Sequence, residues 1–153
     1  GARPINARSE TVLVKPAFRD AFLKRWCLIP ADGFYEWQTQ EGTKQPFFFS
    51  DPQGQVLALA GLWESWRAPD GGLLRTCCIL TTAANAQVAP VHDRMPLILA
   101  PRSWATWLAG PAGAAQALLV PAPVAALRGW PVSHRVNRVA EYGTDLMAPV
   151  AAG

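Results

Sequence analysis

The sequence predicts an α+β protein in which a mainly antiparallel β-sheet curls into a barrel-like core with short flanking helices. Through the middle of the chain, short runs of apolar, β-branched and aromatic residues alternate with turn-forming residues, as in a β meander or barrel. On either side of this region, apolar residues at helical spacing follow a proline. Half of the 153 residues are hydrophobic and 16% are charged, which excludes a disordered chain.

The first expected elements are a helix and two strands. Residues 16–25 predict a helix, because Pro16 stands at an early position and apolar residues recur every fourth position. Residues 27–29 and 34–37 are apolar and β-prone, and the Pro-Ala-Asp-Gly run at 30–33 has the composition of a turn. We therefore expect two strands joined by that turn.

Further strands and short helices are expected along the rest of the chain. Clusters of Pro, Asp and Gly at 51–54 and 69–72 mark turns between strands. A short helix is expected after Pro101, and the Ala-rich segment that follows should form short helices broken by Pro121 and Pro123. The expected strands are residues 46–50, 56–66, 73–82, 95–100 and a last strand near 130–133.

Length and charge restrict the class of protein. The length matches one domain, which we expect over residues 1–153. A net charge of +3 and a pI near 9.0 permit a nucleic-acid partner without requiring one. Prolines interrupt the uncharged stretch 103–127, and no signal-peptide pattern opens the chain, so a cytoplasmic monomer without a membrane span is expected. Because the chain begins at Gly1 without an initiator Met, we expect it to be N-terminally incomplete.

The cysteines and histidines do not form a recognisable metal site or internal nucleophile. Cys27, Cys77 and Cys78 are odd in number and lack CxxC spacing, so reduced thiols are expected. Cys27 lies in an apolar strand, which makes it a poor partner for His92 in a thiol-imidazole pair. No HxH, HxxxH or HExxH spacing is present, so neither a metal nor another cofactor is expected.

Few side chains in the sequence are suited to acid-base chemistry. Glu36 stands between Tyr35 and Trp37 in an apolar strand, where its pKa should be raised, although it is equally compatible with the outward-facing position of an alternating strand. His92 lies in a polar turn between apolar segments and is either catalytic or structural. His134 is expected on the surface. Trp37 is where a stacked base would make chemical sense, whereas most tryptophans belong to cores.

A polar run at residues 6–11 is too rich in hydrogen-bonding groups for a plain linker. Alternatively, Ser9 or Thr11 caps a helix. Arg8, in this run, and Arg94 are natural ligands of phosphate because the guanidinium fork matches phosphate oxygens.

Several blocks, taken together and in this order, resemble the SOS response-associated peptidase (SRAP) family over essentially the whole chain. The closing motif of the family is similar to the Trp-Pro-Val-Ser run at 130–133 with Val136 and Asn137. The other blocks are NARSET at 6–11, CLIPADGFYEW at 27–37, AGLWE at 60–64, ILTT at 79–82 with Ala84 and Asn85, and HDRMP at 92–96.

The resemblance implies a sensor of abasic sites in single-stranded DNA. Members of the family carry a catalytic cysteine directly after the initiator Met, and this cysteine forms a thiazolidine crosslink with the ring-opened sugar. That nucleophile is absent from the present sequence, so the chain as given is expected not to crosslink. The resemblance assigns proton transfer, including release of the initiator Met, to Glu36 and sugar ring-opening to His92. It assigns positioning of the terminal amine to Asn6.

The resemblance also implies how DNA is held. Arg8 and Arg94 match phosphate contacts, and Trp37 matches a base-stacking or strand-wedging residue, so little sequence preference is expected. A nucleoid-associated location in the cytoplasm follows. Two alternatives remain open, namely a thiol peptidase acting on other proteins and a non-catalytic module that binds single-stranded DNA.

Overall fold

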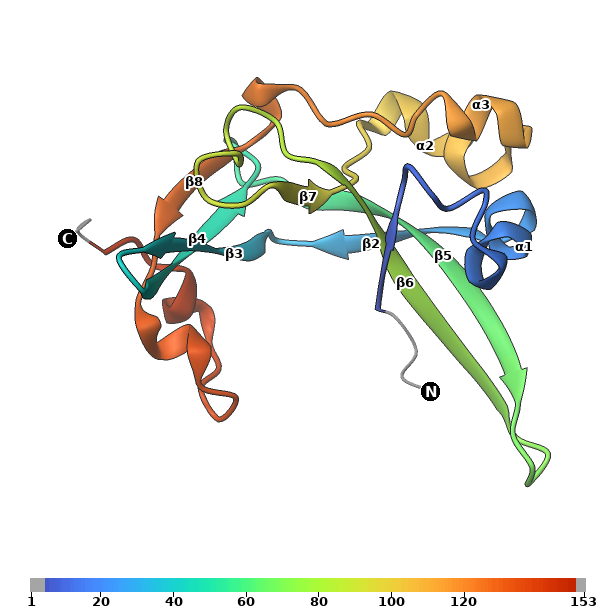
Figure 1. Cartoon of the computed structure of the whole chain (residues 1–153), viewed down its shortest axis with the longest axis horizontal. Coiled ribbons are helices and arrows are strands. Elements are labelled where there is room, and N and C mark those ends of the chain that lie inside the picture. Colours follow the sequence, from blue (N-terminus) through green and yellow to red (C-terminus); the bar gives the residue numbers. More distant parts are fainter. Residues whose placement is uncertain (1–4, 151–153) are drawn as a thin grey trace. The chain divides into compact units, whose positions relative to one another are not determined.

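The computed structural model describes residues 5–150, and the chain divides into two compact units (Figure 1). Of the described residues, the first unit comprises 5–30, 58–83 and 95–122. The second comprises 31–57, 84–94 and 123–150. Each unit is therefore assembled from three separated stretches of sequence.

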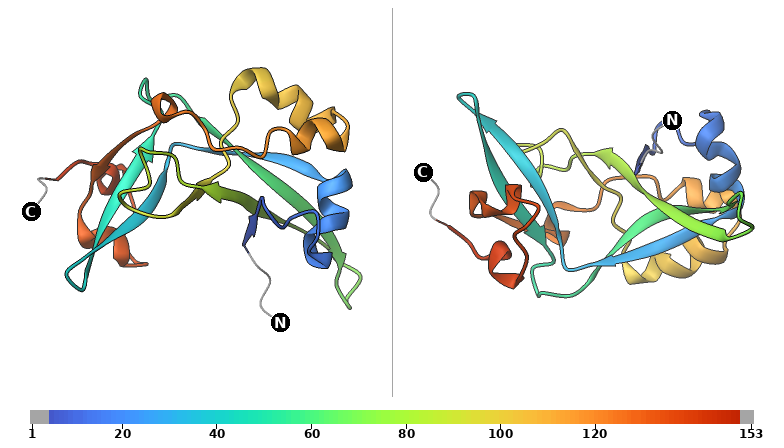
Figure 2. Two further views of the ribbon diagram at one scale, coloured as in Figure 1. Left: turned by 45° about the horizontal axis from the view of Figure 1, so that its top comes forward. Right: turned by 90° about the horizontal axis from the view of Figure 1, so that it is seen from below.

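A five-stranded sheet forms the framework of the first unit. Its strands follow the order β1-β6-β5-β2, and β7 also pairs with β6. β5 and β6 form an antiparallel hairpin that Figure 2 shows as a pair of long neighbouring strands, and β1 runs parallel to β6. The bounds are β1 Asn6–Arg8, β2 Trp26–Ala31, β5 Leu57–Arg67, β6 Leu73–Ala83 and β7 Arg94–Pro96.

Three helices contribute to the core of the first unit. They are α1 Pro16–Lys24, α2 Pro101–Ala109 and α3 Ala112–Gln116. Proline opens α1 and α2, where the missing N–H needs no intrahelical partner. Phe22 and Trp107 are fully buried with their ring centroids 6.2 Å apart, and Trp107 Nε1 donates a hydrogen bond to the Cys27 carbonyl (2.9 Å). The indole is thus buried without losing its polar contact.

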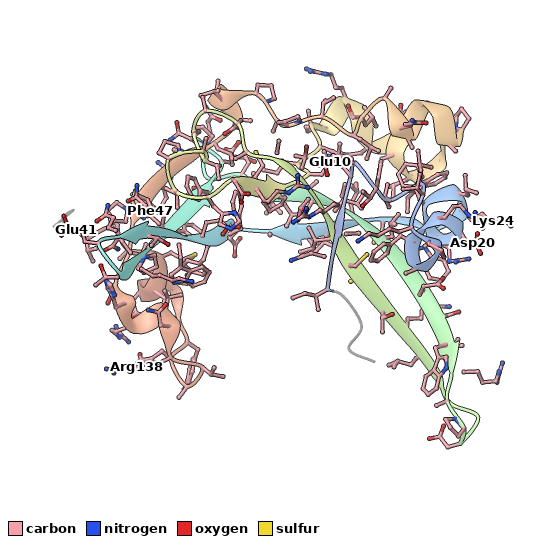
Figure 3. All side chains as sticks on the ribbon, in the orientation of Figure 1. Glu10, Asp20, Lys24, Glu41, Phe47 and Arg138 are labelled. Carbon is pink, nitrogen blue, oxygen red and sulfur yellow. The ribbon has the colours of Figure 1, made fainter. Side chains whose placement is uncertain are left out.

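A three-stranded antiparallel sheet, in the order β3-β4-β8, forms the second unit. β3 is Phe34–Gln40, β4 is Thr43–Ser50 and β8 is Arg128–Pro131. A two-residue turn joins β3 to β4, and its residues Glu41 and Gly42 have φ of 43° and 84°; Figure 3 labels Glu41 at this end of the hairpin. The short 3₁₀ helices η1 Val124–Ala126, η2 His134–Asn137 and η3 Thr144–Met147 belong to the same unit.

Close packing fixes where β3 begins. A Cβ added to Gly33 would lie 2.2 Å from the Phe49 carbonyl oxygen and 2.4 Å from Phe48 Cζ, so only glycine fits there. From Phe34 onward the β3–β4 register is regular, with Glu36 opposite Phe47. The glycine and the two-residue turn therefore bound a hairpin of set length.

Most expected elements are confirmed, including the helix that begins at Pro16, the helix that begins at Pro101, and most strands, but the strand expected over residues 95–100 is only β7 Arg94–Pro96. The turn at 30–33 does not make a hairpin, because β2 belongs to the sheet of β5 while β3 pairs with β4. The barrel is not confirmed, since the strands described within residues 5–150 form two separate sheets and no closed barrel.

Three further expectations concern a helix cap at Ser9 or Thr11, the start of the chain and membrane-spanning helices. Neither Ser9 nor Thr11 caps a helix, because the residue preceding α1 is Lys15 and it makes no side-chain cap. The start of the chain, Gly1, lies outside the described residues. Within the described residues, none of the helices has the length and apolar character needed to cross a membrane. The expectation of one domain stays a prediction.

Candidate active site

The two faces of β3 carry different chemistry. Successive residues of a strand point to opposite faces, so Glu36 and Gln38 share one face and Trp37 points to the other. The hydrogen bonds agree, because Gln38 Nε2 donates to the Pro90 carbonyl (2.8 Å) whereas Trp37 Nε1 donates to Asn137 Oδ1 on η2 (2.7 Å). The loop that contains Pro90 therefore lies on the Glu36 face.

This loop, residues 84–93, connects β6 to β7 and presents His92. Asn85 Oδ1 accepts hydrogen bonds from the backbone N–H groups of Gln87 and Val88 and thereby shapes the first turn. The backbone N–H of His92 donates to the Val88 carbonyl (3.0 Å), and the Val88 side chain is fully buried. His92 is consequently attached to a buried anchor four residues earlier.

Glu36 and His92, the two residues to which the family resemblance assigns the acid-base steps, lie close together. His92 Nδ1 lies 3.8 Å from Glu36 Oε2, although 56 positions separate the two residues. The Glu36 side chain is 23% exposed and that of His92 is 41% exposed, so both can reach a bound molecule. Asp93 Oδ1, on a largely exposed side chain, lies 3.4 Å from the same nitrogen.

His92 Nδ1 lies against the backbone of Arg94. The Arg94 N–H donates to Nδ1 (3.0 Å) in the tautomer that carries its proton on Nε2. The Arg94 carbonyl oxygen, 3.1 Å from the same nitrogen, accepts from Nδ1–H in the other tautomer or in the charged ring. Both arrangements hold the ring at the start of β7.

The surroundings of Glu36 raise the pKa of its carboxyl group. Burial is the main cause, His92 opposes it, and the charge of Asp93 adds a smaller upward contribution. The burial comes partly from aromatic neighbours, since Phe47 lies directly opposite on β4 and the rings of Phe34 and Phe49 stack at 5.3 Å on the same face. A carboxyl group with a raised pKa is suited to both accepting and donating a proton near neutral pH.

The other predicted site residues fall in both units. Asn6 and Arg8 are exposed on β1 of the first unit, with Ala7 buried between them. Arg94 begins β7 and is half-buried, and Trp37 is half-buried in the second unit. The pairing of Glu36 and His92 thus lies wholly within the second unit. His134 is exposed on η2, as expected.

Burial raises the pKa of both Cys27 and Cys78, which makes these two thiols poor nucleophiles. Burial, with smaller contributions from Cys77 and Cys78, raises the pKa of Cys27 to about 11, so its thiol stays protonated at neutral pH. Cys77 lines a largely apolar pocket of about 460 Å³ between α1 and the β5–β6 hairpin. None of the predicted site residues lines this pocket. Among the described residues, no three His, Cys, Asp or Glu side chains gather in a way that could hold a metal ion.

Two residues at this site carry roles that the sequence reasoning did not assign. Gln38 follows Glu36 by two positions on the same strand, and that period-two spacing was the available signal. Asn137 was part of a recognised block, but its contact with Trp37 joins residues 100 positions apart. Nothing in the spacing of the sequence indicates such a contact.

Comparison with known proteins agrees with the resemblance seen in the sequence. The family model described as SOS response associated peptidase (SRAP) matches residues 1–139. The chain belongs to this family. Among curated relatives, the abasic site processing protein YoqW of Bacillus subtilis is 39% identical over 152 residues, covering 96% of this chain and 67% of the relative. The abasic site processing protein HMCES of Gallus gallus is 34% identical over 172 residues, covering 97% of this chain and 51% of the relative.

Solved structures resemble the SRAP chain as well. A protein from Bordetella bronchiseptica is 33% identical with a TM-score of 0.78, covering 84% of this chain and 64% of that one. A protein from Bacteroides thetaiotaomicron, 23% identical with a TM-score of 0.88, covers 95% of this chain and 66% of that one and shares the fold. The chain thus spans about two thirds of the Bacillus relative and of these two solved chains, and about half of the chicken relative.

Proposed function

We propose that the protein detects abasic sites in single-stranded DNA and holds them in a covalent DNA-protein crosslink. The observation that carries the proposal is the Glu36–His92 pair, a carboxyl group with a raised pKa beside an imidazole, within a chain of the SRAP family. Relatives at 34–39% identity are named abasic site processing proteins. An abasic site in equilibrium with its ring-opened form presents an aldehyde, which suits acid-base chemistry without a cofactor.

The proposed reaction joins the aldehyde carbon to an N-terminal cysteine. The α-amine, whose ordinary pKa near 8 leaves an appreciable fraction neutral, adds to the aldehyde carbon to give a carbinolamine. Loss of one water gives an imine, and the thiolate of the same residue adds to the imine carbon. The nitrogen takes up the thiol proton and the thiazolidine ring closes. One water leaves overall, and nothing is oxidised or reduced.

Within this reaction, the pair moves protons. Glu36, as carboxylate, accepts a proton from the attacking amine and, as carboxylic acid, returns it to the departing hydroxyl. His92 would favour ring-opening by donating a hydrogen bond to the sugar ring oxygen, with Nε2–H available for this in the tautomer whose Nδ1 accepts from the Arg94 N–H. Asn6, whose side chain carries both a donor and an acceptor, would position the terminal amine. The same acid-base group would serve in autoproteolytic release of the initiator Met.

Binding of the strand is assigned to charge and aromatic surface. Arg8 and Arg94 would contact phosphates, and Trp37 would stack on a base or wedge between bases. Such contacts give little sequence preference and a strong dependence on salt. We place the protein in the cytoplasm with the nucleoid, as a monomer.

Two other functions are less well supported. A peptidase that cleaves other proteins needs an activated thiol beside its base, whereas the raised pKa of Cys27 keeps that thiol protonated. A module that only binds single strands does not require a buried carboxyl group beside a histidine. Cleavage of an unrelated peptide that depends on Cys27 would favour the peptidase.

The test is a crosslinking assay with abasic single-stranded DNA, resolved under denaturing conditions. The intact protein with an N-terminal cysteine is expected to give a denaturant-stable adduct without reductant. Residues 1–153 alone are expected to give none, because Gly1 supplies an amine but no thiol. An adduct from residues 1–153 that disappears in Cys27→Ser would identify an internal nucleophile and overturn the proposed chemistry.

A further inference from the structure

Gln38 connects the strand that carries Glu36 to the loop that carries His92. Its Nε2 donates to the Pro90 carbonyl (2.8 Å), two residues before His92. Gln40, two positions further along the same face of β3, donates through Nε2 to Gln38 Oε1. This second bond orients the Gln38 amide so that its nitrogen faces Pro90.

The loop needs such a connection because its internal bonds set its shape but not its distance from β3. Hydrogen bonds within residues 84–93 include those from Val91 and His92 to the Val88 carbonyl and from Ala84 to the Asp93 carbonyl. The buried Val88 side chain fixes one point of the loop. Strands β6 and β7 hold the ends of the loop, and Asn85 Nδ2 donates to the Pro123 carbonyl (3.5 Å). The bond to Pro90 joins the loop to β3 and restricts its movement relative to that strand.

The Glu36–His92 separation is sensitive to such a movement. At 3.8 Å, the carboxylate and Nδ1 are just beyond direct hydrogen-bond distance, so a small displacement of the loop either joins them or separates them. Catalytic rates respond steeply to displacements of this size, with about 10²-fold lost for about 1 Å. The exposed hydrogen bond between Gln38 and Pro90 should therefore contribute little to stability and yet affect the distance between Glu36 and His92.

We propose that Gln38 is a positioning residue, which holds Pro90 and thereby fixes His92 against Glu36. Only the rate measurement below rests on the proposed function, because the position of the ring can be measured without DNA. The hydrogen bonds described for the Gln38 side chain go to the Pro90 carbonyl and come from Gln40, so it acts through the loop backbone.

Nuclear magnetic resonance of the histidine ring nitrogens, in the intact protein, tests the proposal directly. The described histidines are His92 and His134, and exposed His134 serves as an internal reference. Gln38→Met keeps the shape and removes the donor, and Gln38→Lys keeps an N–H donor. We expect the His92 ring-nitrogen signals to be alike in the parent and in Gln38→Lys, and to be shifted in Gln38→Met.

The matched control is Thr39→Ala, an exposed neighbour on the opposite face of β3. It should leave the His92 signals unchanged. In the crosslinking assay, Gln38→Met should be slower by about 10- to 10²-fold at saturating DNA, with Gln38→Lys restoring most of the rate. Unchanged His92 signals in Gln38→Met, or equal changes in Thr39→Ala, would overturn the proposal. Altered His92 signals in a protein that never crosslinks would support Gln38 as a positioning residue and refute the proposed function.

Discussion

The two faces of β3 differ in how their polar atoms are satisfied. On one face, the indole N–H groups of Trp37 and of Trp130 each donate to a neutral oxygen, Asn137 Oδ1 and the Met147 carbonyl. On the other face, Glu36 and His92 are ionisable groups that approach to 3.8 Å without a hydrogen bond between them. Both faces are lined by phenylalanines from β4.

On the tryptophan face, the indole N–H groups are hydrogen-bonded to other parts of the protein. On the glutamate face, Glu36 and His92 are accessible to a bound molecule. The aromatic rings of the tryptophan face pack against one another. The ring centroids of Tyr35 and Phe48 are 5.1 Å apart, and those of Phe48 and Trp130 are 5.5 Å apart. The glutamate face places a carboxyl group over aromatic rings, which raises the pKa of Glu36 through burial. Changes on the first face should affect stability and, at Trp37, the proposed binding of the strand, whereas changes on the second should affect chemistry.

The largest expected effect is on the chemical step. In the intact protein, Glu36→Gln should slow crosslinking by roughly 10²- to 10⁴-fold, because the amide cannot transfer a proton, and should leave affinity for undamaged single strands nearly unchanged. Crosslinking rates at saturating DNA and binding isotherms measure the two effects separately. Glu41→Gln, at the exposed β3–β4 turn, is the control and should retain the parent rate. Equal losses of rate and affinity in Glu36→Gln would mean that Glu36 is structural.

A smaller effect is expected on the tryptophan face. Asn137→Ala removes the acceptor of the Trp37 indole and should lower the free energy of unfolding by about 1 kcal/mol, the usual net value of one hydrogen bond. Denaturant unfolding measures the loss, and the Trp37 N–H resonance should shift while that of Trp130 does not. The crosslinking rate at saturating DNA should stay within about 2-fold of the parent. A large fall in that rate would show that the two faces are not separable.

The next expected effect is on the dependence of binding on salt. Arg94→Ala should reduce the slope of log affinity against log salt by about 0.7, the value for one phosphate contact in single-stranded DNA, and Arg8→Ala should do the same. Binding should weaken alike for all sequences. Arg138→Ala is the control, since that side chain lies 3.9 Å from Glu141 in an exposed ion pair. An unchanged slope together with sequence-dependent losses would reassign Arg94 as a base-reading or structural residue.

The smallest expected effect is the stability gained when Glu36 is neutralised. Because the folded state raises the pKa of this carboxyl group, the folded protein binds more protons than the unfolded one between the ordinary and the raised value. Stability contributed by Glu36 therefore falls as the pH rises through that window. Glu36→Gln should be more stable than the parent above the window and equal to it below the ordinary carboxyl pKa. Thermal unfolding at several pH values measures this, and a variant less stable than the parent at neutral pH would contradict it.

Local patterns in the sequence were sufficient for the helices and strands but not for how the strands pair. Pro16 predicted the start of α1 because proline suits the first turn of a helix. The Pro-Ala-Asp-Gly run at 30–33 predicted a bend correctly, yet a bend does not reveal whether the flanking strands pair with each other. The two-residue turn at Glu41 was missed, although a Gly at its second position is typical of tight hairpins.

The sequence indicated the site residues whose chemistry is unusual for their surroundings. It did not indicate contacts between residues that are far apart in the sequence. Glu36 stood out as a carboxylate among aromatic residues, and His92 as an imidazole in a polar turn. Their proximity was not evident from the spacing, because 56 residues of separation carry no distance information. The contact of Gln38 with Pro90 depends on how the loop returns to β3, which no local pattern encodes.

The tight fit at Gly33 has a consequence for how this segment can change in length. Gly33 has no room for a side chain, and the Glu41–Gly42 turn sets the other end of β3, so the hairpin cannot slip. With the register carried from Gly33, inserting or deleting one residue between Gly33 and Glu36 would exchange the faces, directing Trp37 toward the His92 loop and Glu36 toward η2. Such single-residue insertions and deletions should therefore abolish chemistry even when the protein still folds, whereas the turn itself is the place where extra residues can be accommodated.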